Sequence, residues 1–387
     1  MYGRIMTDFK NGFEYLKKVR EKSERERATF DSFKNYLDYK AREKGIPIEG
    51  QFELTPLCNF DCRMCYVHLT KDQLGGRHIL DAKEWKEVMH RAWKAGMIKA
   101  TLTGGECLAY PGFKEIYLYL HSLGCEVTVL TNGYLIDDEW IEFFKAHRPA
   151  MMRITLYGHD EDSYERVTRH RGFERVKGNI RRLQEAGIAL MLSFTPNRYL
   201  GGENCETYRT ARSLCDNVML SNALFEPREE TGRSGSTGGI GDDAYLELYR
   251  LRDELDGLEP LPVSEEELPP AGGPTHVCSG EGLECGGGRS GFCIDWKGQM
   301  HPCTRFYMIG ADALGDGFEK AWRQIKQIVT QWPRTPECEG CAYEPACIRC
   351  AAYFMQFAKP GKQPLELCER VRYYVKNGVW RIPECDD

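Results

Sequence analysis

The chain has 387 residues, which is long enough for two or three domains with buried cores, and its formal net charge of −6 gives no reason to expect a nucleic-acid partner. No apolar run is long enough to span a bilayer, and the N-terminal residues lack the apolar stretch of a secretion signal. We therefore expect a cytoplasmic protein with no membrane partner, in a compartment that disfavours disulfides. Its 17 cysteines are then better explained as ligands of metals or iron–sulfur clusters than as a disulfide framework.

Residues 1–48 predict a charged helical arm. Apolar side chains such as Phe13, Leu16, Phe33 and Leu37 supply a possible stripe, and Gly45 is expected to end the helix. We expect this arm to pack on the following domain, and the docking of a leader peptide is the alternative.

Residues 49–256 alternate short apolar runs with amphipathic segments, which predicts an α/β domain. Six β-then-α units with short connections favour a parallel sheet, either open and doubly wound or curved into a partial barrel. In both folds, functional side chains gather at the carboxyl ends of the strands. Strands are expected at 52–56, 99–103, 126–131, 151–157, 189–195 and 218–225, and helices near 82–96, 112–123, 136–146, 173–186, 203–213 and 243–256.

The C-terminal part is expected to form a separate, cysteine-rich domain. A Pro-rich linker is predicted at 257–276, and residues 277–387 then hold ten of the 17 cysteines. Within this domain, "FCIDWKGQMHPC" alternates like a β-hairpin that turns at Lys297–Gly298. The acidic segment 226–230 is expected at the solvated surface.

Three cysteines directly follow the first predicted strand. Cys58, Cys62 and Cys65 have the spacing C-x3-C-x2-C, which leaves a disulfide, a zinc site or an open iron–sulfur site to be considered. A structural zinc site requires a fourth ligand and is usually closed. Three thiolates on one compact loop suit a four-iron cluster in which one iron lacks a protein ligand and can bind a small molecule.

This spacing, on a loop after the first strand, resembles the signature of the radical S-adenosylmethionine (SAM) superfamily. The resemblance implies a partial (β/α)6 barrel of the TIM type. It also implies that Cys58, Cys62 and Cys65 hold a [4Fe-4S] cluster whose open iron chelates SAM. The family cleaves SAM to a 5′-deoxyadenosyl radical, which abstracts hydrogen from the substrate, and takes its electrons from a flavodoxin- or ferredoxin-type donor.

A second stretch, "LTGGEC" at 102–107, resembles the GGE motif of the same family. By this resemblance, Gly104 and Gly105 let the backbone approach SAM, and Glu106 holds the SAM ammonium group. Cys107 stands where the family usually has Pro.

Weaker resemblances extend the expected SAM site. Thr155, in "ITLYG", is expected to contact the ribose or the carboxylate, with Arg166 or Arg169 as a carboxylate partner. Tyr66 is expected to contact the adenine. The alternative for Thr155 is a β-branched strand residue without a ligand.

The cysteines of residues 277–387 resemble the SPASM extension, which carries two auxiliary [4Fe-4S] clusters in many peptide-modifying radical SAM enzymes. The resemblance implies three clusters in all. A pair of zinc ribbons is the alternative, since C-x2-C pairs are common in them. The implied ligands are Cys278, Cys285, Cys303 and Cys350 for the first auxiliary cluster and Cys338, Cys341, Cys347 and Cys368 for the second, whereas Cys293 and Cys385 are unassigned.

The reaction is expected to be the modification of a ribosomally made precursor peptide, by an oxidative thioether or carbon–carbon cross-link or a related backbone change. Sulfatase-maturing relatives carry a general-base Asp directly after the cysteine equivalent to Cys303, and this chain has Thr304, which is no base at neutral pH. The segment before the barrel is too short for the usual leader-recognition domain, so a separate protein, the arm or the barrel surface would take that role. The alternatives are a radical SAM enzyme acting on a small molecule or a protein side chain, and a non-enzymatic metal-binding protein.

Overall fold

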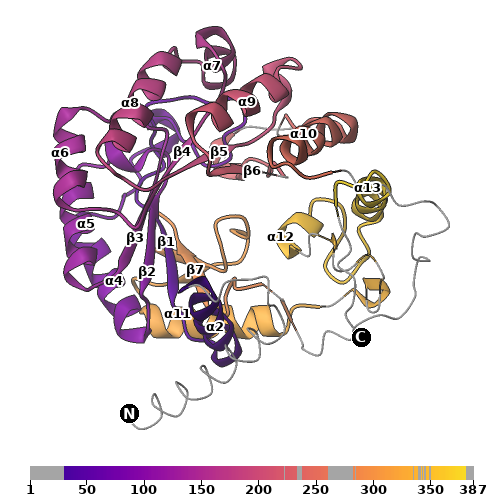
Figure 1. Cartoon of the computed structure of the whole chain (residues 1–387). Coiled ribbons are helices and arrows are strands. Elements are labelled where there is room, and N and C mark those ends of the chain that lie inside the picture. The colour runs from indigo at the N-terminus through magenta and orange to yellow at the C-terminus, as the bar shows by residue number, and fades with distance from the viewer. Residues whose placement is uncertain are drawn as a thin grey trace.

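The computed structural model describes residues 30–380, except 222, 233–237, 260–281, 284, 334, 339–340, 342, 344–345 and 348–349. Cys278, Cys385, most of the predicted arm and most of the predicted linker therefore lie outside the described residues. Figure 1 shows a strongly curved sheet with helices on its outer side and the C-terminal segments across its open side.

Six β/α units form the barrel part of the chain, as the alternating pattern predicted. Its strands are β1 (Glu49–Glu53), β2 (Lys99–Thr103), β3 (Glu126–Thr131), β4 (Met151–Thr155), β5 (Leu190–Phe194) and β6 (Val218–Leu220). The helices are α2 (Phe30–Lys44), α3 (Lys71–Leu74), α4 (Ala82–Ala95), α5 (Phe113–Ser122), α6 (Asp138–Ala146), α7 (Glu161–Thr168), α8 (Phe173–Glu185), α9 (Asn204–Leu214) and α10 (Asp242–Leu255). None of the helices in the described part of the chain is long and apolar enough to cross a membrane.

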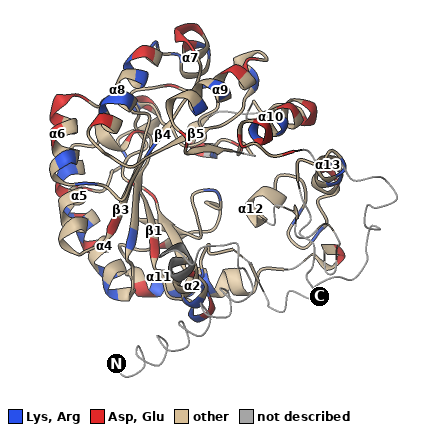
Figure 2. Cartoon of the chain, in the orientation of Figure 1, with Lys and Arg blue, Asp and Glu red and all other residues tan. Residues whose placement is uncertain are grey.

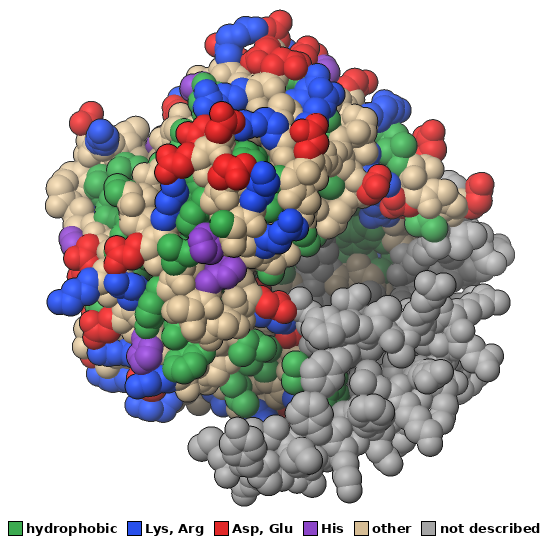
Figure 3. Space-filling model, turned by 60° about the vertical axis from the view of Figure 1, so that its left-hand side comes forward, with side chains coloured by type: hydrophobic (Ala, Val, Ile, Leu, Met, Phe, Trp, Pro, Cys, Tyr) green, Lys and Arg blue, Asp and Glu red, His purple; other side chains and the backbone are tan. Residues whose placement is uncertain are grey.

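Local sequence explains why the outer helices form where they do. Asp81 begins α4 with a capping box, accepting hydrogen bonds from the backbone of the first turn while Glu84 bonds back to it. Apolar positions three and four apart then place Trp85, Val88 and Met89 on the buried face. The opposite faces carry interspersed acidic and basic side chains, as Figures 2 and 3 show.

The strands form one sheet of nine, in the order β6-β5-β4-β3-β2-β1-β7-β8-β9. All pairs from β6 to β1 are parallel, which confirms the predicted partial barrel. Along β3, Val127 and Val129 are buried, whereas Leu130 lines a cavity inside the barrel.

The sheet continues past the predicted linker. The predicted hairpin is confirmed as β7 (Gly291–Ile294) and β8 (Gln299–His301), with Gly298 at the turn in a left-handed conformation. β7 pairs in parallel with β1, and β9 (Ala311–Asp312) extends the sheet beyond β8. The remaining helices are α11 (Phe318–Thr330), α12 (Ala351–Phe354) and α13 (Leu365–Lys376).

Several elements differ from the prediction. β6 ends at Leu220 instead of 225, β4 ends at Thr155 instead of 157, and the four-residue helix α3 was not predicted. β1 begins three residues before the expected strand and ends at Glu53, because pairing with β2 and β7 holds the polar residues at its start in the sheet. The short helix α7 was not predicted. Asp160 and Ser163 cap it, but it is only eight residues long and offers too few apolar repeats to stand out in the sequence.

Candidate functional site

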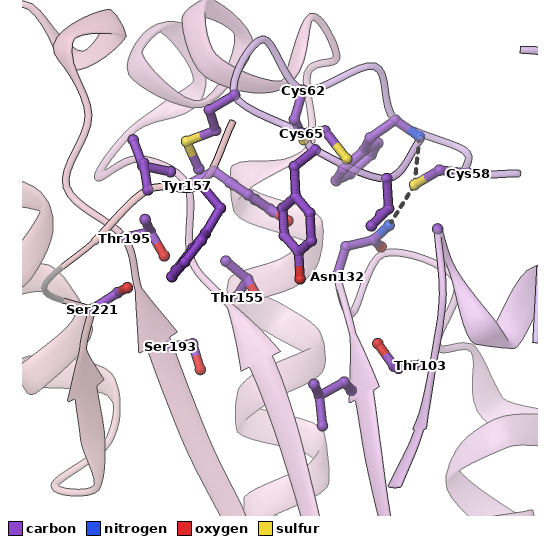
Figure 4. A pocket seen from close by; sticks show the side chains of 18 of the residues that line it. Cys58, Cys62, Cys65, Thr103, Asn132, Thr155, Tyr157, Ser193, Thr195 and Ser221 are labelled. Carbon is purple, nitrogen blue, oxygen red and sulfur yellow. Dashed lines mark hydrogen bonds between the residues drawn. The ribbon is translucent and has the colours of Figure 1, made fainter. Parts of the chain in front are cut away.

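A cavity of about 270 Å³ opens at the carboxyl ends of the barrel strands, where the sequence predicted that functional groups gather. Figure 4 shows the cysteine loop above it and polar strand residues along its wall. The lining includes Cys58, Cys62, Cys65, Tyr66, Thr103, Gly104, Gly105, Asn132, Thr155, Tyr157, Ser193, Thr195 and Ser221.

The structure brings the three cysteines of the C-x3-C-x2-C loop together at this cavity. The Cys58 Sγ accepts hydrogen bonds from the Phe60 backbone at 3.4 Å and the Asn132 amide at 3.8 Å, and the Cys65 Sγ accepts one from the His68 backbone at 3.3 Å. Burial, with the charges of Glu106 and Cys65, raises the pKa of Cys58 to about 12, and burial raises that of Cys62 well above its usual value. Sulfur ligands without a nearby cation are therefore protonated at neutral pH, and a bound metal cluster would supply the missing positive charge. This soft donor set fits an iron–sulfur cluster.

Gly104 and Gly105 are needed for a close approach of two backbone segments. A Cβ on Gly104 would lie 2.5 Å from the Thr55 carbonyl oxygen, and one on Gly105 would lie 2.2 Å from that of Leu57. The Gly105 N–H donates to the Thr55 carbonyl at 2.7 Å. The two glycines therefore hold the end of β2 against the segment that leads into the cysteine loop.

Glu106 is buried next to Thr131 and Asn132, and its role as a ligand of the SAM ammonium group stays a prediction. Its side chain is buried, does not line the cavity, and accepts bonds from the Thr131 hydroxyl at 2.7 Å and the Asn132 backbone at 2.8 Å. It also accepts a bond from the Leu108 backbone at 3.0 Å. In this structure the carboxylate ties the loop after β2 to the end of β3, and through Asn132 it supports Cys58.

The remaining predicted SAM contacts divide into two groups. Thr155 and Tyr66 line the cavity. Arg166 does not: it lies on the outer side of α7, where its half-exposed side chain pairs with Glu203. Arg169 likewise pairs with Asp61 at the surface. Both arginines are held in ion pairs at the surface and do not line the cavity, so their contact with the SAM carboxylate stays a prediction.

Sequence reasoning missed several residues of the cavity wall. Asn132 and Tyr157 belong to motifs that were noted, but neither was given a role. Arg153 shares the inward face of β4 with Thr155, so strict alternation along "MMRITLY" was a signal that could have found it. Arg305 also lines the cavity, and no pattern in its surroundings predicted it.

A buried ion pair between Arg228 and Glu53 lies near Tyr66. The Arg228 guanidinium donates two hydrogen bonds of 2.7 Å to Glu53 on β1, and the two side chains are only 3% and 4% exposed. Arg228 also donates to the Thr304 carbonyl at 3.2 Å and, from its backbone, to that of Tyr66. Segment 226–230 was predicted as solvated surface. This prediction is wrong for Arg228, because its side chain is buried and pairs with the Glu53 carboxylate.

The C-terminal cysteines lie in two groups. A Cβ on Gly287 would lie 3.5 Å from the Cys285 Sγ and 3.2 Å from the Pro302 carbonyl oxygen, so Cys285 lies beside the residue that precedes Cys303. Burial, together with the Cys350 and Cys285 thiols, raises the pKa of Cys303 to about 11. Among the described residues, no group of three or more His, Cys, Asp or Glu side chains is arranged to hold a single metal ion. A separate small cavity is lined by Cys338, Cys341, Cys347 and Cys368.

Comparisons with known proteins connect this site to a family. A family model described as the radical SAM superfamily matches residues 52–204. The sporulation killing factor maturation protein SkfB of Bacillus subtilis is 31% identical over 39% of this chain and 36% of its own length. The antilisterial bacteriocin subtilosin biosynthesis protein AlbA of the same organism is 26% identical over 74% of this chain and 60% of its own. The chain thus spans less than two thirds of both.

A probable GTP 3′,8-cyclase of Saccharolobus solfataricus is 30% identical over 57% of this chain and 68% of its own length. Among solved structures, Streptococcus suis SuiB bound to S-adenosylmethionine superposes with a TM-score of 0.65 over 93% of this chain and 88% of SuiB. At 16% identity that likeness concerns the fold. The region matched by the family model contains the cysteine loop, Gly104–Gly105 and the cavity-lining ends of β2 to β5, and the chain belongs to the radical SAM superfamily.

Proposed function

We propose that the protein is an enzyme that binds a [4Fe-4S] cluster and SAM and modifies a peptide substrate. The observation that carries the proposal is the convergence of Cys58, Cys62 and Cys65 on one cavity at the carboxyl end of a parallel barrel. Relatives named for the maturation of a killing factor and the biosynthesis of a bacteriocin support a peptide substrate. SuiB, whose fold is similar, is described in complex with its precursor peptide SuiA.

The three cysteines would hold the cluster, and Gly104, Gly105 and Thr155 would lie against SAM. When bound, these groups supply one-electron cleavage of SAM and hence hydrogen abstraction from a substrate carbon. The protein's own contribution is orientation and the exclusion of water. Tyr66 and Tyr157 provide aromatic surface in the cavity, and the Asn132 amide, which bonds Asn59 at 2.8 Å, holds the cysteine loop in place.

The two groups of C-terminal cysteines support two auxiliary clusters, as in the SPASM extension. We assign Cys285, Cys303 and Cys350, with Cys278 outside the described residues, to one. The four cysteines around the small cavity, Cys338, Cys341, Cys347 and Cys368, belong to the other. The expected content is about twelve iron atoms per chain, three clusters of four. Zinc ribbons would instead give about two zinc ions per chain and no redox chemistry.

The proposal extends to partners and location. A flavodoxin- or ferredoxin-type donor would supply the electron, and a cytoplasmic setting would keep the 17 cysteines available as ligands. A separate protein, the helical arm or the barrel surface would recognise the leader of the precursor peptide. Thr304, which follows Cys303, disfavours formylglycine formation, because its hydroxyl cannot act as the required base.

A small-molecule substrate is the second candidate. It is favoured by the probable GTP 3′,8-cyclase, whose identity to this chain is 30%. Mass spectrometry separates the two candidates: short peptides encoded beside the gene are incubated with the reconstituted enzyme, SAM and a reductant. A loss of two hydrogens supports cross-linking, and deuterium uptake from heavy water at unchanged hydrogen count supports epimerisation. If no such peptide changes while GTP or another small molecule is consumed, the peptide proposal is wrong.

A further inference from the structure

Arg153 extends from the inward face of β4 into the cavity without a carboxylate partner. Its Nε donates to the Ser193 hydroxyl at 3.0 Å, and its Nη2 points at the Met219 sulfur at 3.3 Å. A thioether is a weak acceptor, so the guanidinium retains unused donor capacity. The side chain is half-buried, and its position is fixed by these neighbours.

Arg305, two residues after Cys303, lines the same cavity and comes from the C-terminal segment. Its guanidinium lies 4.8 Å from the centre of the Phe225 ring. A cation–π contact of this kind leaves the guanidinium N–H groups available for a further ligand. The Arg305 side chain is exposed and contributes to the lining of the cavity.

Among the residues that the structure describes, no acidic side chain lines the cavity, whereas two arginines do. Within the described part of the chain, no Asp or Glu forms an ion pair with either arginine, and their side chains contact Ser193, Met219 and Phe225 instead. Arg228 differs from these two arginines, because its buried guanidinium donates hydrogen bonds to both carboxylate oxygens of Glu53. A cleft lined by charge of one sign concentrates ligands of the opposite sign.

We propose that Arg153 and Arg305 bind a carboxylate of the substrate, an Asp or Glu side chain close to the residue that is modified. The inference rests on the proposed function and adds a substrate class to it. The carboxylate of SAM has the same chemistry and is the competing occupant. Depth favours the substrate: Arg153 lies two residues before Thr155 on the same face of β4, about 7 Å further from the cysteine loop. In Figure 4, Ser193, which Arg153 contacts, likewise lies further from the cysteines than Thr155.

The test uses reconstituted holoenzyme with SAM to select from a displayed library of random twelve-residue peptides. Wild-type protein is expected to enrich Asp or Glu at one position by about tenfold, the discrimination that a charged hydrogen bond provides. R153Q and R305Q are expected to lose most of this preference, and R305E is expected to favour Lys or Arg instead. R250Q, a change at an exposed arginine on α10, is the matched control and should keep it.

A second measurement, equilibrium dialysis of SAM, identifies the occupant. The dissociation constant of SAM should stay within about twofold in R305Q, since losing a charged hydrogen bond would cost about tenfold. A tenfold weaker SAM affinity with an unchanged acidic preference would assign the arginines to SAM and overturn the inference.

The peptide selection has two further outcomes that overturn the inference and leave the proposed function standing. In the first, the enriched peptides have no acidic position, and in the second, R153Q and R305Q leave the acidic preference intact. If no peptide is enriched by any form, the peptide function fails and the inference fails with it. R153K and R305K keep the charge and should retain part of the preference, which excludes misfolding as the cause of a loss.

Discussion

Replacing Glu53 with Leu should destabilise the protein more than any exposed ion-pair substitution. The change leaves the Arg228 guanidinium in a site where its side chain is 3% exposed and without the two 2.7 Å hydrogen bonds that it makes to Glu53. Burial lowers the pKa of Arg228, but the Glu53 carboxylate raises it more, so the folded protein holds this group charged. With Glu53 gone, a buried charge has no counter-ion.

The expected loss in the free energy of unfolding is about 3–5 kcal/mol, which is typical of removing one partner of a buried pair. Coulomb's law gives a similar value, about 4 kcal/mol for unit charges about 4 Å apart at an effective dielectric constant of about 20. The midpoint of thermal unfolding should then fall by roughly 4–6 °C. Arg228 also bonds the Thr304 carbonyl through its side chain and the Tyr66 carbonyl through its backbone N–H. The position of Tyr66 at the cavity should therefore become less fixed as well.

The assay is a double-mutant cycle of E53L, R228M and E53L/R228M, followed by thermal unfolding at equal iron content. The double variant should recover most of the loss, because an apolar pair needs no compensation. R91M breaks an exposed pair with Glu87 on α4 and should cost at most about 1 kcal/mol. A coupling energy below about 0.5 kcal/mol between positions 53 and 228 would refute the reasoning.

Three further predictions concern the cavity. Cys58→Ala should lower the iron content by about four atoms per chain, measured together with acid-labile sulfide, and unchanged iron would exclude Cys58 as a ligand. Iron loading should strengthen as pH rises from about 7 to about 9, because burial raises the pKa of Cys58 to about 12 and its proton must leave on binding; a pH-independent affinity would contradict this. Gly105→Ala should lower the unfolding midpoint, since its Cβ would lie 2.2 Å from the Leu57 oxygen, whereas Gly178→Ala in α8, where the Cβ meets nothing within 4 Å, should raise it.

Much of the barrel could be predicted from sequence, because its strands and helices repeat apolar residues with the period of their own structure. β2 and β3 have the predicted bounds. The cysteine loop could be placed because its ligands are close together in the chain. The parallel pairing of β7 with β1 could not, since it joins segments separated by more than 200 residues and leaves no local pattern.

Charged residues were the harder part of the site. Arg228 lies in an acidic segment that has the composition of a surface loop, and only the tertiary fold brings Glu53 to it. Two other arginines, Arg166 and Arg305, also lie where the sequence did not predict them. Arg166 was predicted as a carboxylate partner, yet its side chain pairs with Glu203 outside the cavity, whereas Arg305 lines the cavity and was not predicted.

The most direct test of the account is SAM cleavage by anaerobically reconstituted, reduced protein. We expect 5′-deoxyadenosine from the wild-type enzyme and none from the C58A/C62A/C65A variant at equal protein concentration. Wild-type protein that contains about twelve iron atoms per chain and binds SAM, yet forms no 5′-deoxyadenosine, would contradict it.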